Sequence, residues 1–350
     1  MTNNHNHDDI TYMQRALQLA ALGEGAVSPN PMVGAVITAR GRIIGQGWHR
    51  RYGGPHAEVN AVADVAEADL HLLPESTIYV TLEPCSHWGK TPPCSRLIID
   101  KGIRRVVVGC EDPNPKVAGR GLRLLREAGR EVVCGVLEQE CRNINRRFMT
   151  AHCRRRPWIL LKFARTADGF IGNPEGFPSL RISTPLSQMW MHRERASVDA
   201  IMAGSRTVLI DNPRLDSRLW PGKDPVAVSF ASAALNPEAQ ILSRPHILMP
   251  AGMSLDQFMS DLFENHSVTS LMVEGGRETL QSFINAGLYD ELRIETSPLR
   301  ASEIFSMQCP GLNAVENPEF IRQPELPEDL TIVSDISCGK NRILFLKRMR

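Results

Sequence analysis

At 350 residues the chain is too long for one ordinary hydrophobic core, and its length predicts two domains. Its hydrophobic fraction of 42% and charged fraction of 23% are those of ordinary globular proteins, and no apolar run is long enough to cross a bilayer, which argues against a membrane protein. A formal net charge of +1 argues against a general nucleic-acid binder, because such proteins usually carry a clear basic excess, so small-molecule chemistry is favoured.

The beginning of the chain and its cysteines bear on location. Residues 1–9 are polar and lack the apolar segment of a secretory signal, so we expect a flexible leader there. The eight cysteines have no framework spacing, which favours a reducing cytoplasm over a disulfide scaffold. Of these eight, only Cys85 and Cys94 lie within a motif.

Residues 10–153 show the pattern of an α/β domain. Two prolines enclose Asn30 in a stiff turn, and two short strands after it predict a hairpin. Strands then alternate with helices, which predicts a largely parallel sheet covered on both faces. In chain order the expected elements are a helix over 11–22, strands over 32–37 and 42–48, a helix over 56–66, a strand over 77–82, a helix over 95–101, a strand over 105–109, a helix over 121–128, a strand over 131–136 and a helix over 138–152.

The stretch from His56 to Cys94 carries the strongest chemical signal. One histidine, His56, and two cysteines, Cys85 and Cys94, can fill three tetrahedral positions on zinc and leave the fourth to water, as a catalytic zinc requires. Glu58 is the acid beside them. This order of residues is typical of zinc-dependent nucleobase deaminases, in which the glutamate moves protons without binding the metal.

A second domain is expected over 154–350. Six arginines between residues 142 and 156 are scattered over a helix and its end, which favours a solvated or inter-domain face over a nucleic-acid patch. Pro157 marks the boundary, and a strand over 158–164 follows it. Further on, Gly275-Gly276 stands between a strand over 270–273 and a helix over 279–286, where bare backbone amides suit a pyrophosphate.

Four motifs of the first domain occur together in one known family. They are Ser28-Pro29-Asn30-Pro31-x-Val33-Gly34, His56-Ala57-Glu58, Leu82-Glu83-Pro84-Cys85-Ser86-His87-x-Gly89-x-Thr91-Pro92-Pro93-Cys94, and Asp112-Pro113-Asn114-Pro115-x-Val117-Ala118-Gly119-x-Gly121. The chain thereby resembles the bifunctional riboflavin-biosynthesis deaminase/reductases. The eight residues between Cys85 and Cys94 are the specific feature, because most nucleoside and tRNA deaminases have two.

For the first domain, the resemblance implies a cytidine-deaminase-like fold. It implies removal of the pyrimidine amino group from 2,5-diamino-6-(5-phosphoribosylamino)-4(3H)-pyrimidinone. Zn²⁺ on His56, Cys85 and Cys94 is expected to lower the pKa of a water molecule. Glu58 is expected to pass the proton of that water to the ring nitrogen and to the departing ammonia. The residues expected near the substrate are Asn30 and His49.

The resemblance continues to about Phe345 and implies a dihydrofolate-reductase-like α/β second domain. This domain is expected to use NADPH to reduce the ribosyl group of the deaminated product to ribityl. The substrate residues that it implies are Lys162, Asp168, Ser179, Arg195, Leu215, Arg218 and Glu274. The cofactor residues that it implies are Arg165, Arg181, Thr207, Asp211 and a turn of Gly276, Arg277, Glu278, Thr279, Leu280, Gln281 and Ser282.

Two departures from the family pattern fall on the cofactor pocket. Thr166-Ala167-Asp168-Gly169-Phe170 stands where Ser-Leu-Asp-Gly and a basic residue are common, and Arg181 stands where tryptophan is common. The alternatives are a deaminase with a degenerate reductase domain, a nucleic-acid or nucleoside deaminase, and a non-catalytic zinc-stabilised binding module. From the resemblance we also expect a homodimer or larger oligomer.

Overall fold

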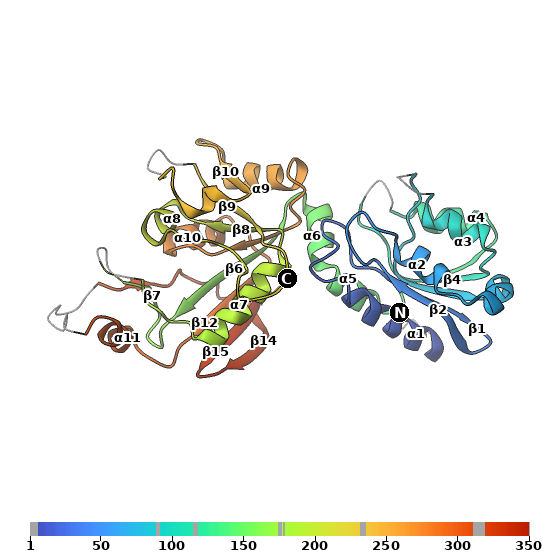
Figure 1. Cartoon of the computed structure of the whole chain (residues 1–350), viewed down its shortest axis with the longest axis horizontal. Coiled ribbons are helices and arrows are strands. Elements are labelled where there is room, and N and C mark those ends of the chain that lie inside the picture. The colour runs from blue at the N-terminus through green and yellow to red at the C-terminus, as the bar shows by residue number, and fades with distance from the viewer. Residues whose placement is uncertain are drawn as a thin grey trace. The chain divides into compact units, whose positions relative to one another are not determined.

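The computed structural model describes residues 6–88, 92–114, 118–173, 177, 179–231, 236–310 and 319–349. The chain divides into two compact units, Met1–Arg155 and Arg156–Arg350 (Figure 1). Helix α6 (Arg146–Arg154), near the end of the first unit, packs Met149 into its core. Among the described helices, none is both long and apolar enough to cross a membrane.

The first unit is built on a five-stranded sheet with the order β2-β1-β3-β4-β5. Strands β1 and β2 form the expected antiparallel hairpin, and β3, β4 and β5 run parallel, so the prediction of a largely parallel sheet holds for three of its strands. The bounds of the strands are β1 Gly34–Ala39, β2 Arg42–Trp48, β3 Thr77–Leu82, β4 Arg105–Cys110 and β5 Glu131–Cys134.

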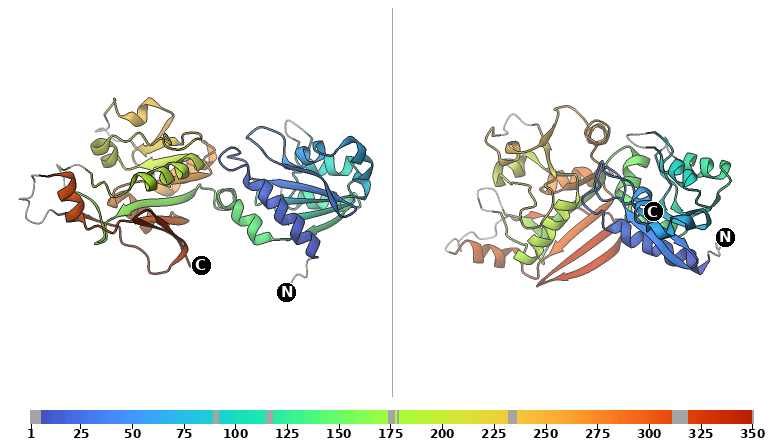
Figure 2. Two further views of the ribbon diagram at one scale, coloured as in Figure 1. Left: turned by 60° about the horizontal axis from the view of Figure 1, so that its bottom comes forward. Right: turned by 45° about the vertical axis from the view of Figure 1, so that its right-hand side comes forward.

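Helices cover both faces of this sheet (Figure 2). One face packs on α2 (Ala57–Ala63), α3 (Cys94–Asp100) and α4 (Arg120–Glu127), whose apolar residues join those of β1, β3 and β4. The opposite face packs on α1 (His7–Ala21), α5 (Glu138–Ile144) and α6. The alternation of apolar side chains along the strands therefore serves two separate cores.

Two expected helices are divided by local interactions. The helix expected over 56–66 ends at Ala63, and a 3₁₀ helix, η1 (Glu67–Glu75), follows it. The helix expected over 138–152 breaks at Asn145. The Asn145 side chain accepts a hydrogen bond from the Met32 N–H at 2.8 Å and donates one to the Met32 carbonyl at 2.9 Å, which ties the break to the start of the hairpin.

The prediction of a flexible leader over residues 1–9 is wrong for its last part. Helix α1 begins at His7, and Asp9 is 3% exposed. The Asp9 carboxylate accepts hydrogen bonds from Arg105 at 2.7 and 2.9 Å and from the Tyr79 hydroxyl at 3.2 Å. A buried carboxylate with these partners anchors the helix to β4, whereas residues 1–5 lie outside the described residues.

The second unit contains an eight-stranded sheet with the order β10-β9-β8-β11-β6-β12-β15-β14. The first six of these strands run parallel, and β15 and β14 extend the sheet antiparallel. A small antiparallel pair, β7 with β13, stands apart from it. The bounds are β6 Trp158–Arg165, β7 Phe170–Gly172, β8 Ala200–Ala203, β9 Val226–Phe230, β10 His246–Met249, β11 Ser270–Val273, β12 Glu291–Thr296, β13 Ile321–Arg322, β14 Leu330–Cys338 and β15 Asn341–Arg348.

The two faces of this second sheet differ in chemistry. One face is apolar and packs on α9 (Leu255–Glu264) and α10 (Arg277–Asn285). The other face packs on α8 (Ser205–Asp211), the short helix η2 (Gln240–Ser243) and α7 (Pro185–Ser197). Beneath α7 the side chains that the sheet presents are charged rather than apolar. Helix α11 (Ala301–Gln308) belongs to a separate small cluster of apolar residues.

Candidate active sites

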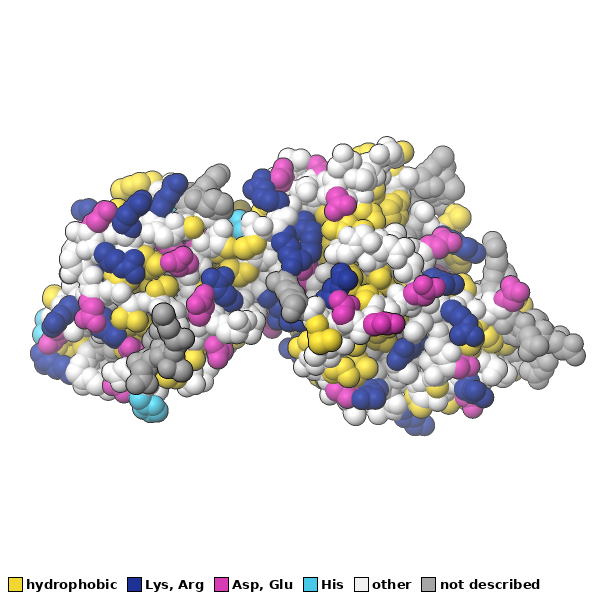
Figure 3. Space-filling view, turned by 180° about the vertical axis from the view of Figure 1, so that it is seen from behind, with side chains coloured by type: hydrophobic (Ala, Val, Ile, Leu, Met, Phe, Trp, Pro, Cys, Tyr) yellow, Lys and Arg dark blue, Asp and Glu magenta, His cyan; other side chains and the backbone are white. Residues whose placement is uncertain are grey.

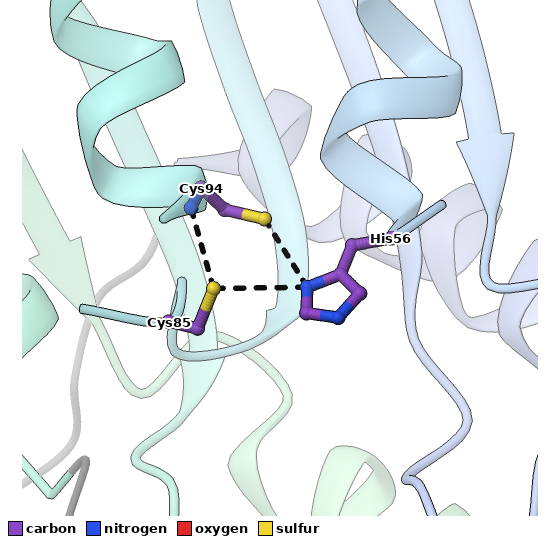
Figure 4. A group of neighbouring side chains, drawn as sticks. All are labelled: His56, Cys85 and Cys94. Carbon is purple, nitrogen blue, oxygen red and sulfur yellow. Dashed lines mark hydrogen bonds between the residues drawn. The ribbon is translucent and has the colours of Figure 1, made fainter. Parts of the chain in front are cut away.

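The structure brings the three expected metal ligands of the first unit together (Figure 4). The His56 Nδ1 atom lies 3.7 Å from the Cys85 Sγ atom and 3.3 Å from the Cys94 Sγ atom. Tetrahedral zinc with ordinary Zn–N and Zn–S bonds would hold nitrogen and sulfur about 3.6 Å apart. The separations observed for His56 lie on either side of that value, so the donor set fits a zinc ion.

Each ligand is placed by a different end of secondary structure. His56 is the N-cap of α2, Cys94 is the first residue of α3, and Cys85 lies in the loop after β3. The Cys94 backbone N–H donates a hydrogen bond of 3.2 Å to the Cys85 sulfur. A helix N-terminus thus stabilises negative charge on the ligand of the neighbouring loop, which favours the thiolate that zinc requires.

Hydrogen bonds link the titrating groups of the site. Hydrogen bonding from Cys94 and from His56 lowers the pKa of the Cys85 thiol to about 4, whereas the same bond raises the pKa of Cys94. The hydrogen bond to Cys85 raises the pKa of His56 to about 9. Glu58 is 3% exposed, and its burial, followed by the charge of Cys85, raises its pKa to about 6. A carboxyl with such a pKa suits a group that takes up and releases protons near neutral pH.

Asn30 and His49, expected near the substrate, lie next to this trio. The Asn30 Nδ2 atom is 3.1 Å from the His49 Nε2 atom, and the His49 Nδ1 atom is 3.0 Å from the Pro55 carbonyl oxygen. The Asn30 amide nitrogen can only donate a hydrogen bond and the Pro55 carbonyl oxygen can only accept one. The His49 imidazole is therefore assigned as neutral with its proton on Nδ1. The His49 and His56 rings meet edge to face with centroids 5.6 Å apart.

A second loop, between β4 and α4, borders the cysteines. Asp112 is 9% exposed, and its Oδ1 atom accepts a hydrogen bond of 2.8 Å from the Asn114 N–H. Burial, with Glu83 as the first contributing charge, raises the pKa of Asp112 to about 6. The motif residues Gly89, Thr91, Pro115 and Val117 lie outside the described residues.

In the second unit, three of the expected substrate residues form one charged network. Arg195 donates two hydrogen bonds of 2.8 Å to the carboxylate of Glu274, and the Lys162 Nζ atom lies 3.8 Å from the same carboxylate. Burial alone would raise the pKa of Glu274, but the charges of Arg195 and Lys162 outweigh it and lower the pKa to about 2. Glu274 follows β11, at the carboxyl ends of the parallel strands, where such sheets bind ligands.

Arg218 joins this network through one intermediary. The Asp216 carbonyl accepts a hydrogen bond of 3.0 Å from Arg195, and the Asp216 carboxylate is paired with Arg218 and Arg214. Leu215, in contrast, is 3% exposed and packs in the core. Any contact between Leu215 and a ligand would therefore be made by its main-chain atoms.

The expected cofactor residues gather where two helices begin. Thr207 of α8 lies near Gly276, since a side-chain Cβ built on that glycine would stand 3.8 Å from the Thr207 hydroxyl. A Cβ built on Gly204, the N-cap of α8, would overlap the Thr279 hydroxyl of α10, so the two helix starts lie close together. Ser179 donates a hydrogen bond to Asp211, which links an expected substrate residue to an expected cofactor residue.

The remaining expected residues of the reductase unit are engaged elsewhere or open to solvent. Residues 277–282 form the start of α10 rather than a turn, and Leu280 is fully buried in the apolar core, because the helix must turn one face to the sheet. Asp168 accepts hydrogen bonds from Thr166 at 2.6 Å and from the Ala301 N–H at 3.0 Å, so it caps α11. The residues with structural partners are Arg165, Arg277, Gln281 and Ser282, and the exposed ones include Arg181 and Glu278.

The charged layer beneath α7 was not foreseen from the sequence. Arg293 of β12 is 0% exposed and pairs with Glu194 at 3.0 Å and with Glu295 at 3.6 Å. It lies opposite Lys162 in the strand register. The available signal was the alternation Leu292-Arg293-Ile294-Glu295, which places two charges on one face of a central strand.

The first unit has the ligand set and the buried acid of a zinc deaminase, and the second has an α/β sheet with a helix-terminus site of the kind found in nucleotide-dependent reductases. Family models match both units. The cytidine and deoxycytidylate deaminase zinc-binding region matches residues 6–110, and the RibD C-terminal domain matches residues 157–300.

Whole-chain comparisons agree with this division. Riboflavin biosynthesis protein RibD of Aquifex aeolicus is 37% identical over 97% of this chain and 98% of its own length. A solved deaminase/reductase from Thermotoga maritima is 32% identical, with a TM-score of 0.81 over 98% of this chain and 99% of that structure. Acinetobacter baumannii RibD is 26% identical, with a TM-score of 0.84 over 98% and 99%.

The chain belongs to the RibD family of riboflavin biosynthesis proteins. It is a bifunctional enzyme with a deaminase domain, which is a hydrolase, and a reductase domain, which is an oxidoreductase. The predicted fold class, a cytidine-deaminase-like domain followed by a dihydrofolate-reductase-like domain, is confirmed. The alternatives of a deaminase alone, a nucleic-acid deaminase and a non-catalytic module are not favoured, because both enzymatic domains are present.

Proposed function

We propose that the first domain deaminates 2,5-diamino-6-(5-phosphoribosylamino)-4(3H)-pyrimidinone and that the second reduces the ribosyl group of the product with NADPH. The observation that carries the first half is the convergence of one imidazole and two thiols beside buried Glu58. The relative from Thermotoga maritima bears the name of both activities, diaminohydroxyphosphoribosylaminopyrimidine deaminase and 5-amino-6-(5-phosphoribosylamino)uracil reductase.

In the proposed deaminase mechanism, His56, Cys85 and Cys94 hold a zinc ion that, when bound, lowers the pKa of a water molecule. Glu58 would take one proton from that water and pass it to the ring nitrogen as the water oxygen bonds to the carbon that carries the amino group. It would then take the second proton from the same oxygen and deliver it to the amino group, which leaves as ammonia, so that this carbon ends as a carbonyl. Burial keeps Glu58 able to hold the proton, since its pKa of about 6 is close to neutral. Asn30 and His49 orient the pyrimidine.

In the proposed reductase, the charge network binds and orients the phosphorylated sugar. Arg195 is already held in place by Glu274, and Arg218 projects from the same network with half of its side chain exposed. A guanidinium with an exposed edge suits a phosphate, because it gives two parallel charge-assisted hydrogen bonds. Gly276 and Thr207, at the beginnings of α10 and α8, offer backbone amides to the NADPH pyrophosphate.

We also propose a cytoplasmic homodimer or larger oligomer that acts on small molecules rather than on nucleic acid. All eight cysteines are free, as expected in a reducing compartment. Acidic and basic side chains both occur across the face drawn in Figure 3, and the formal net charge of +1 gives no clear basic excess for a polyanion.

A coupled assay tests the proposed function. Purified protein loaded with zinc is given the diaminopyrimidinone phosphate, and ammonia release is measured first without NADPH. Addition of NADPH should then give oxidation of one cofactor molecule for each ammonia released, and NADH at the same concentration should give a slower reaction. Ammonia without NADPH oxidation would refute the reductase half, and no ammonia would refute the deaminase half.

A further inference from the structure

The carboxylate of Glu83 connects three segments of the deaminase domain. Glu83 lies between β3 and the metal-binding loop, two residues before Cys85, and is 4% exposed. Its Oε1 atom accepts hydrogen bonds from the N–H groups of Gly121 at 2.9 Å and Leu122 at 3.3 Å. Its Oε2 atom accepts from the N–H groups of Gly119 at 2.9 Å and Asp112 at 3.3 Å.

Two of these bonds replace a missing helix cap. Helix α4 begins after Gly119, an N-cap that has no side chain to accept the free N–H groups of the first turn. Glu83 supplies the acceptor from the loop that follows β3, and its charge lies at the positive end of the helix. The two bonds to Oε2 hold the loop that carries Asp112 and Asn114 against the same carboxylate.

The packing around Gly121 shows how tightly α4 is fixed to the metal-binding loop. A Cβ atom at Gly121 would overlap the Pro84 carbonyl oxygen and lie 3.2 Å from the Glu83 carboxylate. The helix therefore rests directly on the main chain of the residue before Cys85, and only glycine permits this approach. On the other side of the loop, the Ser95 N–H donates to the Cys85 carbonyl at 3.2 Å.

We propose that Glu83 is a positioning residue of the deaminase, which fixes the Cys85 loop and the Asp112–Asn114 turn against the N-terminus of α4. Glu83 binds neither metal nor substrate. It determines the distance between the zinc ligand Cys85 and the polar turn that faces it, so its removal loosens the metal site and the pyrimidine pocket together. This inference rests on the proposed zinc site of His56, Cys85 and Cys94.

The test uses the full-length, zinc-loaded protein and its Glu83→Gln variant. The glutamine keeps one acceptor atom and turns an NH₂ donor toward two N–H donors, so half of the bonds are lost. We expect zinc transfer to a competing chelator about 10–100-fold faster and deaminase kcat/KM about 10–100-fold lower, as for other residues that support a metal site without ligating it. Amide hydrogen exchange should lose protection at Gly119, Gly121 and Leu122, while NADPH oxidation on supplied deaminated product should be unchanged.

Asp9→Asn is the matched control, because it removes a buried carboxylate from the same domain without touching the metal-binding loop. It should lower domain stability and leave the zinc-transfer rate of the folded protein as in the wild type. If Glu83→Gln does not fold, Gly121→Ala replaces it, since the added Cβ pushes α4 away from Pro84 and should give the same signature.

Two results would overturn the proposal. One is wild-type zinc transfer and amide protection in the Glu83 variant. The other is equal acceleration of zinc transfer by Asp9→Asn, which would reduce the role of Glu83 to general stability. Failure of the proposed zinc site is distinguished separately, because the wild-type protein would then bind no zinc and release no ammonia.

Discussion

The two candidate sites reach charge balance in different ways. In the deaminase site, the ligand atoms of His56, Cys85 and Cys94 lie close together, and a hydrogen bond lowers the pKa of one thiol while it raises that of the other. Both thiols can be ionised at once only with a cation to balance their charge. In the reductase site, Glu274 lies between Arg195 and Lys162, and neighbouring Arg293 pairs with Glu194 and Glu295, so three carboxylates face three cations within the protein. The first site should therefore depend on an external ion, whereas the second should depend on each of its own partners.

The largest expected effect tests the acid of the metal site. Glu58→Gln keeps the size of the side chain but cannot exchange a proton, so ammonia release should fall about 10³-fold, within the range of lost general acid–base catalysis. Reduction of supplied deaminated product should be unchanged, because Glu58 belongs to the other unit. The comparison of the two rates in one preparation is the measurement. Full ammonia release from this variant would contradict the mechanism.

The next effect tests the internally balanced network. Glu274→Gln leaves Arg195 and Lys162 buried without their common counter-charge. We expect reductase kcat/KM to fall about 100-fold and the second unit to lose roughly 3 kcal/mol of unfolding free energy. Deamination should be unaffected. Glu328→Gln, at an exposed glutamate outside this network, is the matched control and should leave both quantities unchanged.

The pH dependence of the same residue follows from its pKa. The folded-state pKa of Glu274 is about 2, below its ordinary value of 4.5, so ionised Glu274 stabilises the folded unit. This contribution is complete above about pH 4.5 and is lost as the pH falls toward 2. Denaturant unfolding at a series of acidic pH values should show this loss in the wild type and a smaller loss in Glu274→Gln. If the unfolding free energy fell equally with pH in the two proteins, ionised Glu274 would contribute nothing to stability.

The difference between the two sites also explains how much of each was predictable from sequence. The metal ligands occupy a short motif, because helix ends and one loop present them locally, and the motif alone indicated zinc deamination. The strands Arg42–Trp48, Thr77–Leu82 and Ser270–Val273 were predicted at their observed bounds from apolar runs between turns. These features depend on nearby residues only.

What sequence reasoning missed depends on contacts between distant segments. Asp9 looked like part of a polar leader, because its partner Arg105 lies 96 residues away. Glu83 was identified only as a member of a motif and was given no role, because its role as a hydrogen-bond acceptor depends on backbone N–H groups of another loop. In the reductase, Arg293 is paired with Glu194 through the packing of α7 on the sheet. The alternation along β12 indicated two charges on one face of the strand, but no local pattern identifies the partners of such distant pairs.

A smaller effect is expected at the beginning of the chain, where the first unit holds a buried charge. Asp9→Asn removes the charge that pairs with Arg105 and should cost about 2 kcal/mol in the unfolding free energy of the first unit. Asp8→Asn, at the exposed neighbouring residue, is the control and should cost well under 1 kcal/mol. Thermal unfolding measures both variants. Equal stability of the two would restore the interpretation of a flexible leader through Asp9.

The smallest effect separates a structural from a functional role for Asp168, the expected substrate residue that caps α11. Asp168→Ala removes the acceptor for the Ala301 N–H and should cost about 1 kcal/mol of stability. Asp168→Asn keeps an acceptor for that N–H without the charge, so it should retain both the cap and the reductase activity if the residue acts only within the fold. Reductase kcat/KM and thermal unfolding of the two variants decide between the roles. A stable Asp168→Asn protein with a tenfold loss of reduction would return Asp168 to the substrate site, because only a contact with the reacting molecules would then need the carboxylate charge.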